Sequence, residues 1–155
     1  MSIEMTISDK RTKDMVYNTT VCYWRKTWGL ANFLVDFFRS SPYLISFDGD
    51  YSFVAKPNII KGIVRAINGK LFNINDEIWE KSLWSPAITR SITMRNLSNL
   101  LAADEWIREP YDKDLLDYYI REDHQFEPLM EERDFVLFLK ERENYVVTIE
   151  LVNSY

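Results

Sequence analysis

The spacing of apolar residues changes along this chain of 155 residues, and the change restricts the folds that it can adopt. Near the N-terminus, Ile3, Met5 and Ile7 alternate with polar residues, which is the period of a strand with one buried face. From Leu30 to Phe38 the apolar residues recur at spacings of three and four, which is the period of a helix. Separate blocks of the two periods favour an α+β fold over regularly alternating strands and helices.

The first predicted helix ends before Pro42, because the residue that precedes a proline is disfavoured in helical geometry. Its apolar stripe extends toward the N-terminus through Val21 and Trp24, so Cys22 is expected inside this helix and packed inward. Because Cys22 is the only cysteine, an internal disulfide bond is excluded. The central stripe consists of Leu30, Phe33, Leu34, Phe37 and Phe38.

Further segments follow along the chain. Residues 43–55 predict a β-hairpin, because Asp48-Gly49 lies between two aromatic arms and suits a tight turn. Pro57 opens a predicted helix that stops at Asn68-Gly69. We expect a short helix at residues 76–84, a strand at 87–94, two helices at 96–107 and 111–123, and a C-terminal β-hairpin at 135–152.

Together these segments predict one α+β domain over residues 1–155, with an antiparallel or mixed sheet and a C-terminal β-hairpin packed against several helices. The composition agrees, since 46% of the residues are hydrophobic and 28% are charged, as in globular proteins. The first residues contain no apolar run that resembles a signal peptide, and no segment is long enough to span a bilayer. We therefore expect a cytoplasmic protein without membrane contact, monomeric when free.

Signatures of catalysis are weak. His124 is the only histidine, so a catalytic triad or a histidine metal site would have to use it, and its partners are not apparent. The sequence has no zinc motif, phosphate loop or dinucleotide fingerprint, and its lysines and arginines are scattered. We accordingly expect no enzyme activity, no cofactor, no metal and no direct contact with nucleic acid.

Asp48 and Asp50 support the one enzymatic alternative. Two carboxylates at a hairpin tip could hold Mg²⁺ in a metal-dependent hydrolase, assisted by Glu127 or His124. The same residues are what a tight turn requires, so the turn is the favoured interpretation.

Charge is distributed unevenly. Residues 1–103 contain 13 Lys or Arg and 9 Asp or Glu, a net charge of +4. Residues 104–134, the acidic segment, contain 4 and 12, a net charge of −8. The remaining residues, 135–155, contain 2 and 3, so the overall charge of −5 conceals a strongly acidic segment.

The acidic segment is interpreted as a contact surface. If residues 111–123 are helical with Leu115 facing the core, Asp114 and Asp117 point outward and Tyr118 lies at the edge between the two sides. A surface selected only for solubility usually mixes both signs of charge, and tyrosine is enriched among the residues that dominate protein interfaces. The expected contact residues are Asp114, Asp117, Tyr118, Glu122, Asp123 and Glu127.

These properties predict a protein that inhibits a basic protein partner. The first hypothesis is an immunity protein, whose acidic surface neutralises a cognate bacterial toxin, such as a nuclease, by covering its cationic active site. A close alternative is a phage anti-defence inhibitor of a host nuclease system. A third is an adaptor in which residues 145–152, which contain few charges, offer a free strand edge to a partner. No family motif accompanies any of these hypotheses.

Overall fold

One antiparallel sheet, with helices packed against it, forms the described part of the chain. A computed structural model describes residues 1–73, 75–108, 138 and 140–153. The sheet has the strand order β2-β1-β5-β4-β3, and every pairing is antiparallel. This arrangement confirms the predicted α+β class. The strands are β1 (Ser2–Asp9), β2 (Met15–Tyr23), β3 (Leu44–Asp48), β4 (Ser52–Ala55) and β5 (Tyr145–Val152); the helices are α1 (Trp28–Ser40), α2 (Ile59–Asn68), α3 (Glu77–Glu80) and α4 (Pro86–Arg108), with a 3-10 turn, η1, at Arg142–Asn144.

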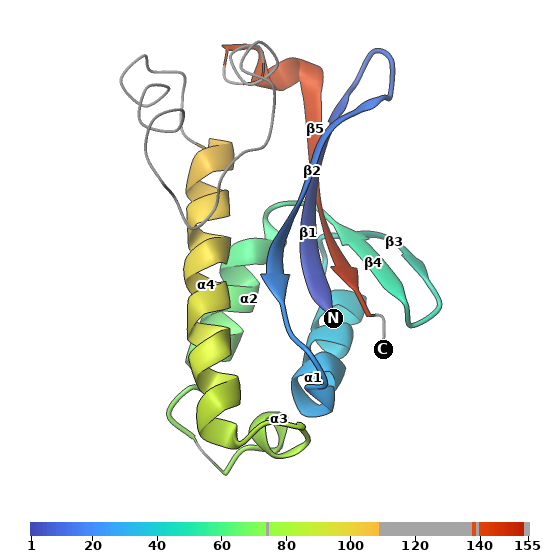
Figure 1. Cartoon of the computed structure of the whole chain (residues 1–155). Coiled ribbons are helices and arrows are strands. Elements are labelled where there is room, and N and C mark those ends of the chain that lie inside the picture. The colour runs from blue at the N-terminus through green and yellow to red at the C-terminus, as the bar shows by residue number, and fades with distance from the viewer. Residues whose placement is uncertain (74, 109–137, 139, 154–155) are drawn as a thin grey trace.

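The hydrophobic core lies between one face of the sheet and the helices. Met5 of β1 pairs with Ile149 of β5, and Ile149 pairs on its other side with Ala55 of β4; all three are fully buried. The alternate residues of β1, such as Glu4 and Thr6, point to the other face and are partly exposed. Figure 1 shows α4 extending beside β2, with β3 and β4 at the opposite edge. The predicted alternation in β1 is confirmed.

The central hairpin and α2 also agree with the sequence. Gly49 adopts a positive φ of 55° between β3 and β4, as a tight turn requires. In α2 the apolar residues form one buried stripe, and the helix ends at Asn68 with Gly69 as its cap. The buried residues of α2 are Ile59, Ile60, Ile63, Val64 and Ile67.

β2 occupies the place where the sequence predicted the start of the first helix. Ile3 pairs with Cys22, but the next residue of β1 pairs with Thr20, so Val21 is an extra residue in a bulge. The bulge leaves two successive residues of β2 buried and disrupts the alternation by which a strand is recognised. Burial raises the pKa of the Cys22 thiol well above its ordinary value. α1 begins after a left-handed turn at Lys26, which has a φ of 51°.

The strand predicted at residues 87–94 is wrong, because these residues belong to α4. Thr89 and Thr93 are fully buried one helical turn apart, whereas Ile88 is 49% exposed. The hydroxyl of Thr93 donates to the Thr89 carbonyl at 2.7 Å and accepts the indole N–H of Trp24 at 3.1 Å. The inward face of α4 is thus polar here, and the hydroxyl of Thr93 has hydrogen-bond partners in the core. Neither α4 nor any other described helix is apolar and long enough to cross a membrane.

β5 lies in the middle of the sheet. Leu151 pairs with Ile3 on one side and with Phe53 on the other. The predicted C-terminal strand is confirmed, but its neighbours are β1 and β4 and not the residues that precede it, of which Phe138 and Lys140 are helical. The adaptor hypothesis is excluded for residues 149–152, which pair with β1 on one side and with β4 on the other. For residues 145–148, which pair with β1 and have no second partner among the described strands, it stays a prediction. The edge strands of the described sheet are β2 and β3.

Gly29 allows α1 and α3 to approach each other closely. A Cβ atom at this position would lie 2.6 Å from the carbonyl oxygen of Glu77 and 2.9 Å from that of Ile78. Both neighbours are backbone atoms, so a side chain at position 29 could fit only if one of the two segments moved. This contact fixes α3 against the N-terminal end of α1.

We expect Gly29→Ala to lower the free energy of unfolding by about 1–3 kcal/mol through overpacking, although alanine is the better helix former. Gly69→Ala is the matched control, because the nearest atoms to its Cβ would be 3.6 Å away and its φ of −62° is ordinary. That control should be neutral or stabilising by up to about 1 kcal/mol. Urea unfolding measures both variants, and equal stabilities would contradict the close approach.

Candidate functional site

The residues that the sequence assigns to the acidic contact surface lie outside the described residues. They are Asp114, Asp117, Tyr118, Glu122, Asp123 and Glu127, and His124 lies outside as well. The structure describes the two borders of this region, which are the C-terminal end of α4 and the residues from Phe138 onward. Between Arg108 and Phe138 the sequence contains ten Asp or Glu and three Lys or Arg.

A buried aromatic cluster joins the two borders. The ring of Trp106, near the end of α4, lies 5.0 Å from the ring of Phe138 and 5.8 Å from that of Tyr17, measured between centroids. Phe138 in turn packs edge-on against Tyr145 at 5.9 Å. All four residues are buried, and such aromatic pairs contribute stability beyond their buried area. The cluster therefore holds Trp106 and Phe138, which precede and follow residues 109–137 in the sequence, against Tyr17 of β2 and Tyr145 of β5.

Arg142 strengthens this attachment at the end of α4. Its guanidinium donates to the carbonyl oxygen of Ile107 at 2.5 Å and to that of Trp106 at 3.1 Å, and it lies 5.4 Å from the ring centroid of Phe138. The last carbonyls of a helix lack partners within the helix, and a cation there is favourable. Arg142 thus binds the end of α4 to the segment that leads into β5.

Asp48 and Asp50 lie at the exposed tip of the β3–β4 hairpin. Asp50 forms an ion pair with Arg39 of α1, and its side chain is 75% exposed. In the described ranges, His, Cys, Asp and Glu form no group of three or more that could hold a metal ion. The hydrolase hypothesis stays a prediction, whereas the turn at Gly49 already accounts for both aspartates.

Two glutamates face each other on the side of the sheet away from α1, α2 and α4. Glu4 of β1 is directly opposite Glu150 of β5, and Glu150 accepts a hydrogen bond from the Ser52 hydroxyl at 2.5 Å. Burial, and secondly the charge of Glu150, raises the pKa of Glu4 above its ordinary value. Like charges directly opposite on a sheet are destabilising. This sheet face therefore carries a carboxylate pair that the fold itself does not require.

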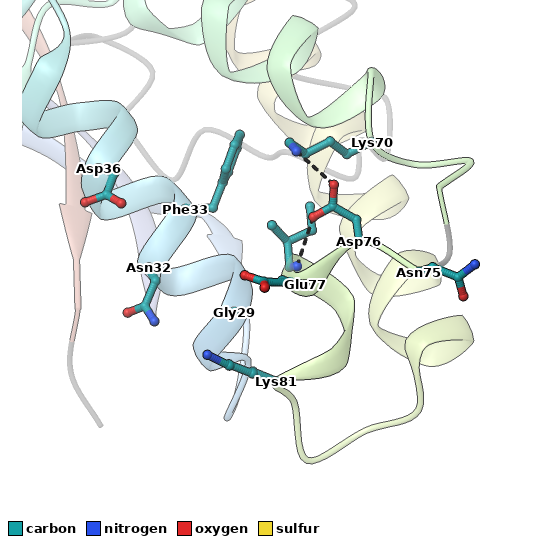
Figure 2. Close-up of a pocket in the computed structure, with 10 residues that line it drawn as sticks. Gly29, Asn32, Phe33, Asp36, Lys70, Asn75, Asp76, Glu77 and Lys81 are labelled. Carbon is teal, nitrogen blue, oxygen red and sulfur yellow. Dashed lines mark hydrogen bonds and ion pairs between the residues drawn. The ribbon is translucent and has the colours of Figure 1, made fainter.

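A polar cleft of about 520 Å³ lies between α1 and the segment around α3. Figure 2 shows Asn32 and Asp36 on the α1 side, with Lys70 and Asp76 pointing toward one another. The ammonium of Lys70 lies 2.8 Å from a carboxylate oxygen of Asp76 and 5.5 Å from the ring centroid of Phe33. These groups could bind a small polar ligand through charge and hydrogen bonds.

The ion pair between Lys70 and Asp76 in this cleft has a structural role. Besides pairing with Lys70, Asp76 caps α3 by accepting the backbone N–H of Ile78 at 3.2 Å. These two hydrogen bonds, that of Lys70 first, lower the pKa of Asp76 below its ordinary value. Asp76 is therefore ionised at neutral pH and already has its partners, which makes it unsuitable as a proton donor.

Comparisons of the chain with protein-family models, with curated proteins and with solved structures find no match. Function is therefore inferred from the residues of this chain alone. The aromatic cluster was not predictable from the sequence, because Phe138 was expected in a strand and its partners come from distant parts of the chain. The contact between Arg142 and the end of α4 had one signal in the sequence. Arg142 is a cation directly before a predicted strand, and cations are favourable at the C-terminal ends of helices.

Glu4 and Asp76 should affect stability with opposite signs. A carboxyl group whose pKa is raised by folding destabilises the protein above that pKa, and the cost disappears as the pH falls through it. We expect Glu4→Gln to raise the melting temperature near pH 7. A carboxyl group whose pKa is lowered by folding stabilises the folded protein at neutral pH. Asp76→Asn should therefore reduce the melting temperature near pH 7, although asparagine can still cap α3.

Both differences in melting temperature from the unchanged protein should vanish in acid. Thermal unfolding at a series of pH values from about 7 down to about 2 measures them. If both substitutions shift the melting temperature in the same direction at neutral pH, the assigned environments are wrong.

Proposed function

We propose that this protein inhibits a basic protein partner by binding it through the acidic segment. The partner is expected to be a bacterial toxin, most specifically a nuclease, for which the chain would be the cognate immunity protein. In this role the carboxylates cover a cationic active site that would otherwise hold nucleic acid. Opposite charge also accelerates the encounter of the two proteins.

One observation carries the proposal, namely the net charge of −8 over residues 104–134 in a chain whose first 103 residues carry +4. Charge that served solubility alone would be mixed in sign and spread over the chain. The attachment of both borders of residues 109–137 to the buried aromatic cluster supports the proposal further. Attachment at both ends lowers the conformational entropy that a segment loses on binding.

A phage-encoded inhibitor of a host nuclease system is the close variant, since it would use the same acidic surface on a different partner. Purification of the tagged chain from its native host, followed by identification of the bound proteins, distinguishes the two. A basic toxin supports the first form and a basic subunit of a defence nuclease supports the second. Recovery of no basic protein would count against both.

Reversal of charge tests the surface directly. Asp114→Lys, Asp117→Lys and Asp123→Lys together change the charge of the acidic segment from −8 to −2. We expect association with the partner to slow at least tenfold at low salt, because long-range steering is lost. The difference should shrink as the Debye length falls from about 30 Å at 0.01 M salt to about 8 Å at 0.15 M. Stopped-flow or surface-based kinetics measure both rates.

The matched control reverses three exposed carboxylates outside the acidic segment, in Asp14→Lys, Glu80→Lys and Glu143→Lys. This variant has the same change in global charge, so it should associate faster than the first variant if the location of the charge matters. Equal rates in the two variants would show that net charge alone acts, and an unchanged rate in the first variant would exclude the acidic segment as the contact.

Tyr118 should contribute differently from the carboxylates. An aromatic anchor acts at short range through desolvated contact, so Tyr118→Ala should raise the dissociation rate about tenfold or more and leave the association rate nearly unchanged. Tyr51→Ala is the control, because Tyr51 is 74% exposed on the β3–β4 hairpin, away from the acidic segment in sequence. If Tyr51→Ala raises the dissociation rate more than Tyr118→Ala does, the contact surface lies at the β3–β4 hairpin instead.

A further inference from the structure

We propose that a pocket formed by α1, α2 and α4 binds a phosphate monoester that carries one planar ring. Two cavities adjoin there and share Tyr43 and Gly62 in their walls. One has a volume of about 350 Å³ and is cationic, and the other has about 190 Å³ and is mainly apolar. Both are distinct from the cleft in Figure 2, and the inference does not depend on the proposed function.

Three cations line the larger cavity. Lys61 and Arg65 lie one turn apart on α2, and Arg108 comes from the end of α4. Within the described residues, Lys61 and Arg65 form no ion pair. Arg108 uses its Nε to bind Asp104 at 2.6 Å, and its terminal nitrogens have no hydrogen bond to another described residue. Among the described residues, the charge of Asp104 offsets one of these three positive charges.

A phosphate monoester matches this charge and geometry. It carries about −1.5 to −2 charges at pH 7, whereas a carboxylate carries one. Guanidinium groups bind phosphate oxygens through pairs of parallel hydrogen bonds, and Arg65 and Arg108 supply two such groups. Asn58 adds an amide at the N-terminal end of α2, which is also the positive end of the helix dipole.

The smaller cavity defines the rest of the ligand. Its walls include Phe37, Pro42, Tyr43 and Ile59. An apolar cavity of about 150 Å³ accommodates benzene in a well-characterised protein, so about 190 Å³ suits a single ring. A Cβ at Gly62 would lie 3.0 Å from the ring of Phe37, so the glycine allows α1 and α2 to approach closely beside the residues that the two cavities share. The ring and the phosphate can therefore belong to one small molecule.

The same chemistry has two possible sources, a free small molecule and a phosphotyrosine side chain of another protein. Phenyl phosphate is the smallest probe that contains the shared elements. In calorimetric titrations of the full chain, we expect phenyl phosphate to bind at least tenfold more tightly than inorganic phosphate, because ring burial adds to the charge contacts. Equal affinities, or no binding of phenyl phosphate, would overturn the proposal.

Variants locate the binding. The double variant Lys61→Gln with Arg65→Gln should bind both phenyl phosphate and inorganic phosphate at least tenfold more weakly than the unchanged protein. Lys10→Gln with Arg25→Gln removes the same charges from two other exposed positions and should leave both affinities unchanged. Tyr43→Ala should reduce the advantage of phenyl phosphate over inorganic phosphate, because Tyr43 is a wall of the apolar cavity. Equal weakening in the two charge variants would show that binding is not in this pocket.

A second titration identifies the source. Cytidine monophosphate represents a free ring-bearing phosphate, and a short phosphotyrosine peptide represents a protein source. Tighter binding of one of them than of phenyl phosphate, lost in Lys61→Gln with Arg65→Gln, supports the proposal and names the source. If both bind the Lys61/Arg65 variant as tightly as the unchanged protein, the pocket is not their site and the proposal fails.

Discussion

Burial of only one face of the antiparallel sheet is the constraint on which the other features depend. The register places Met5, Ile149 and Ala55 side by side on that face, and the helices cover it. Ile3, Met5 and Ile7 of β1 are therefore committed to the core, and residues such as Glu4 and Thr6 are left for the opposite face. The stability of the molecule is concentrated in one layer of contacts, which leaves the other sheet face and the outer sides of the helices available for polar residues.

α4 links this core to the features that bear on binding. Its first half holds Thr89 and Thr93 inward, where Thr93 meets the indole of Trp24. Its last turn places Trp106 in the aromatic cluster and Arg108 in the cationic cavity. The acidic segment therefore begins near the C-terminal end of α4, and the cationic cavity lies beside the same helix end.

The sequence predicted the elements whose patterns are local. β1, the β3–β4 hairpin and α2 follow from alternation, from Asp48-Gly49 and from a regular isoleucine stripe. The errors occurred where a side chain's environment depends on distant partners. The bulge buries Val21, whose spacing of three from the buried Trp24 after the end of β2 resembles a helix. The buried threonines of α4 produced an alternating pattern that resembles a strand. β5 pairs with β1 and β4, which no pattern within residues 135–152 could reveal.

The same distinction applies to the candidate sites. The acidic segment is a property of composition, so the sequence was sufficient to identify it. The cationic cavity was not predictable, because its members come from α2 and α4, which are far apart in the chain and are brought together only by the packing of those helices.

Like charges are neighbours both in the structure and in the sequence of this chain. Glu4 faces Glu150 across the sheet, Lys61 and Arg65 are one turn apart on α2, and the acidic segment carries a net charge of −8. Like-charged neighbours on a helix or across a sheet each cost roughly 0.2–1 kcal/mol, a noticeable fraction of a typical domain's stability when they accumulate. In a chain selected for stability alone, we would expect neighbouring charged residues to carry opposite charges. Departures from local physical rules that have no compensating contact within the fold are characteristic of functional surfaces. Charge segregation is therefore the physical reason for the two proposals, an acidic segment that binds a cationic partner and a cationic cavity that binds an anionic ligand.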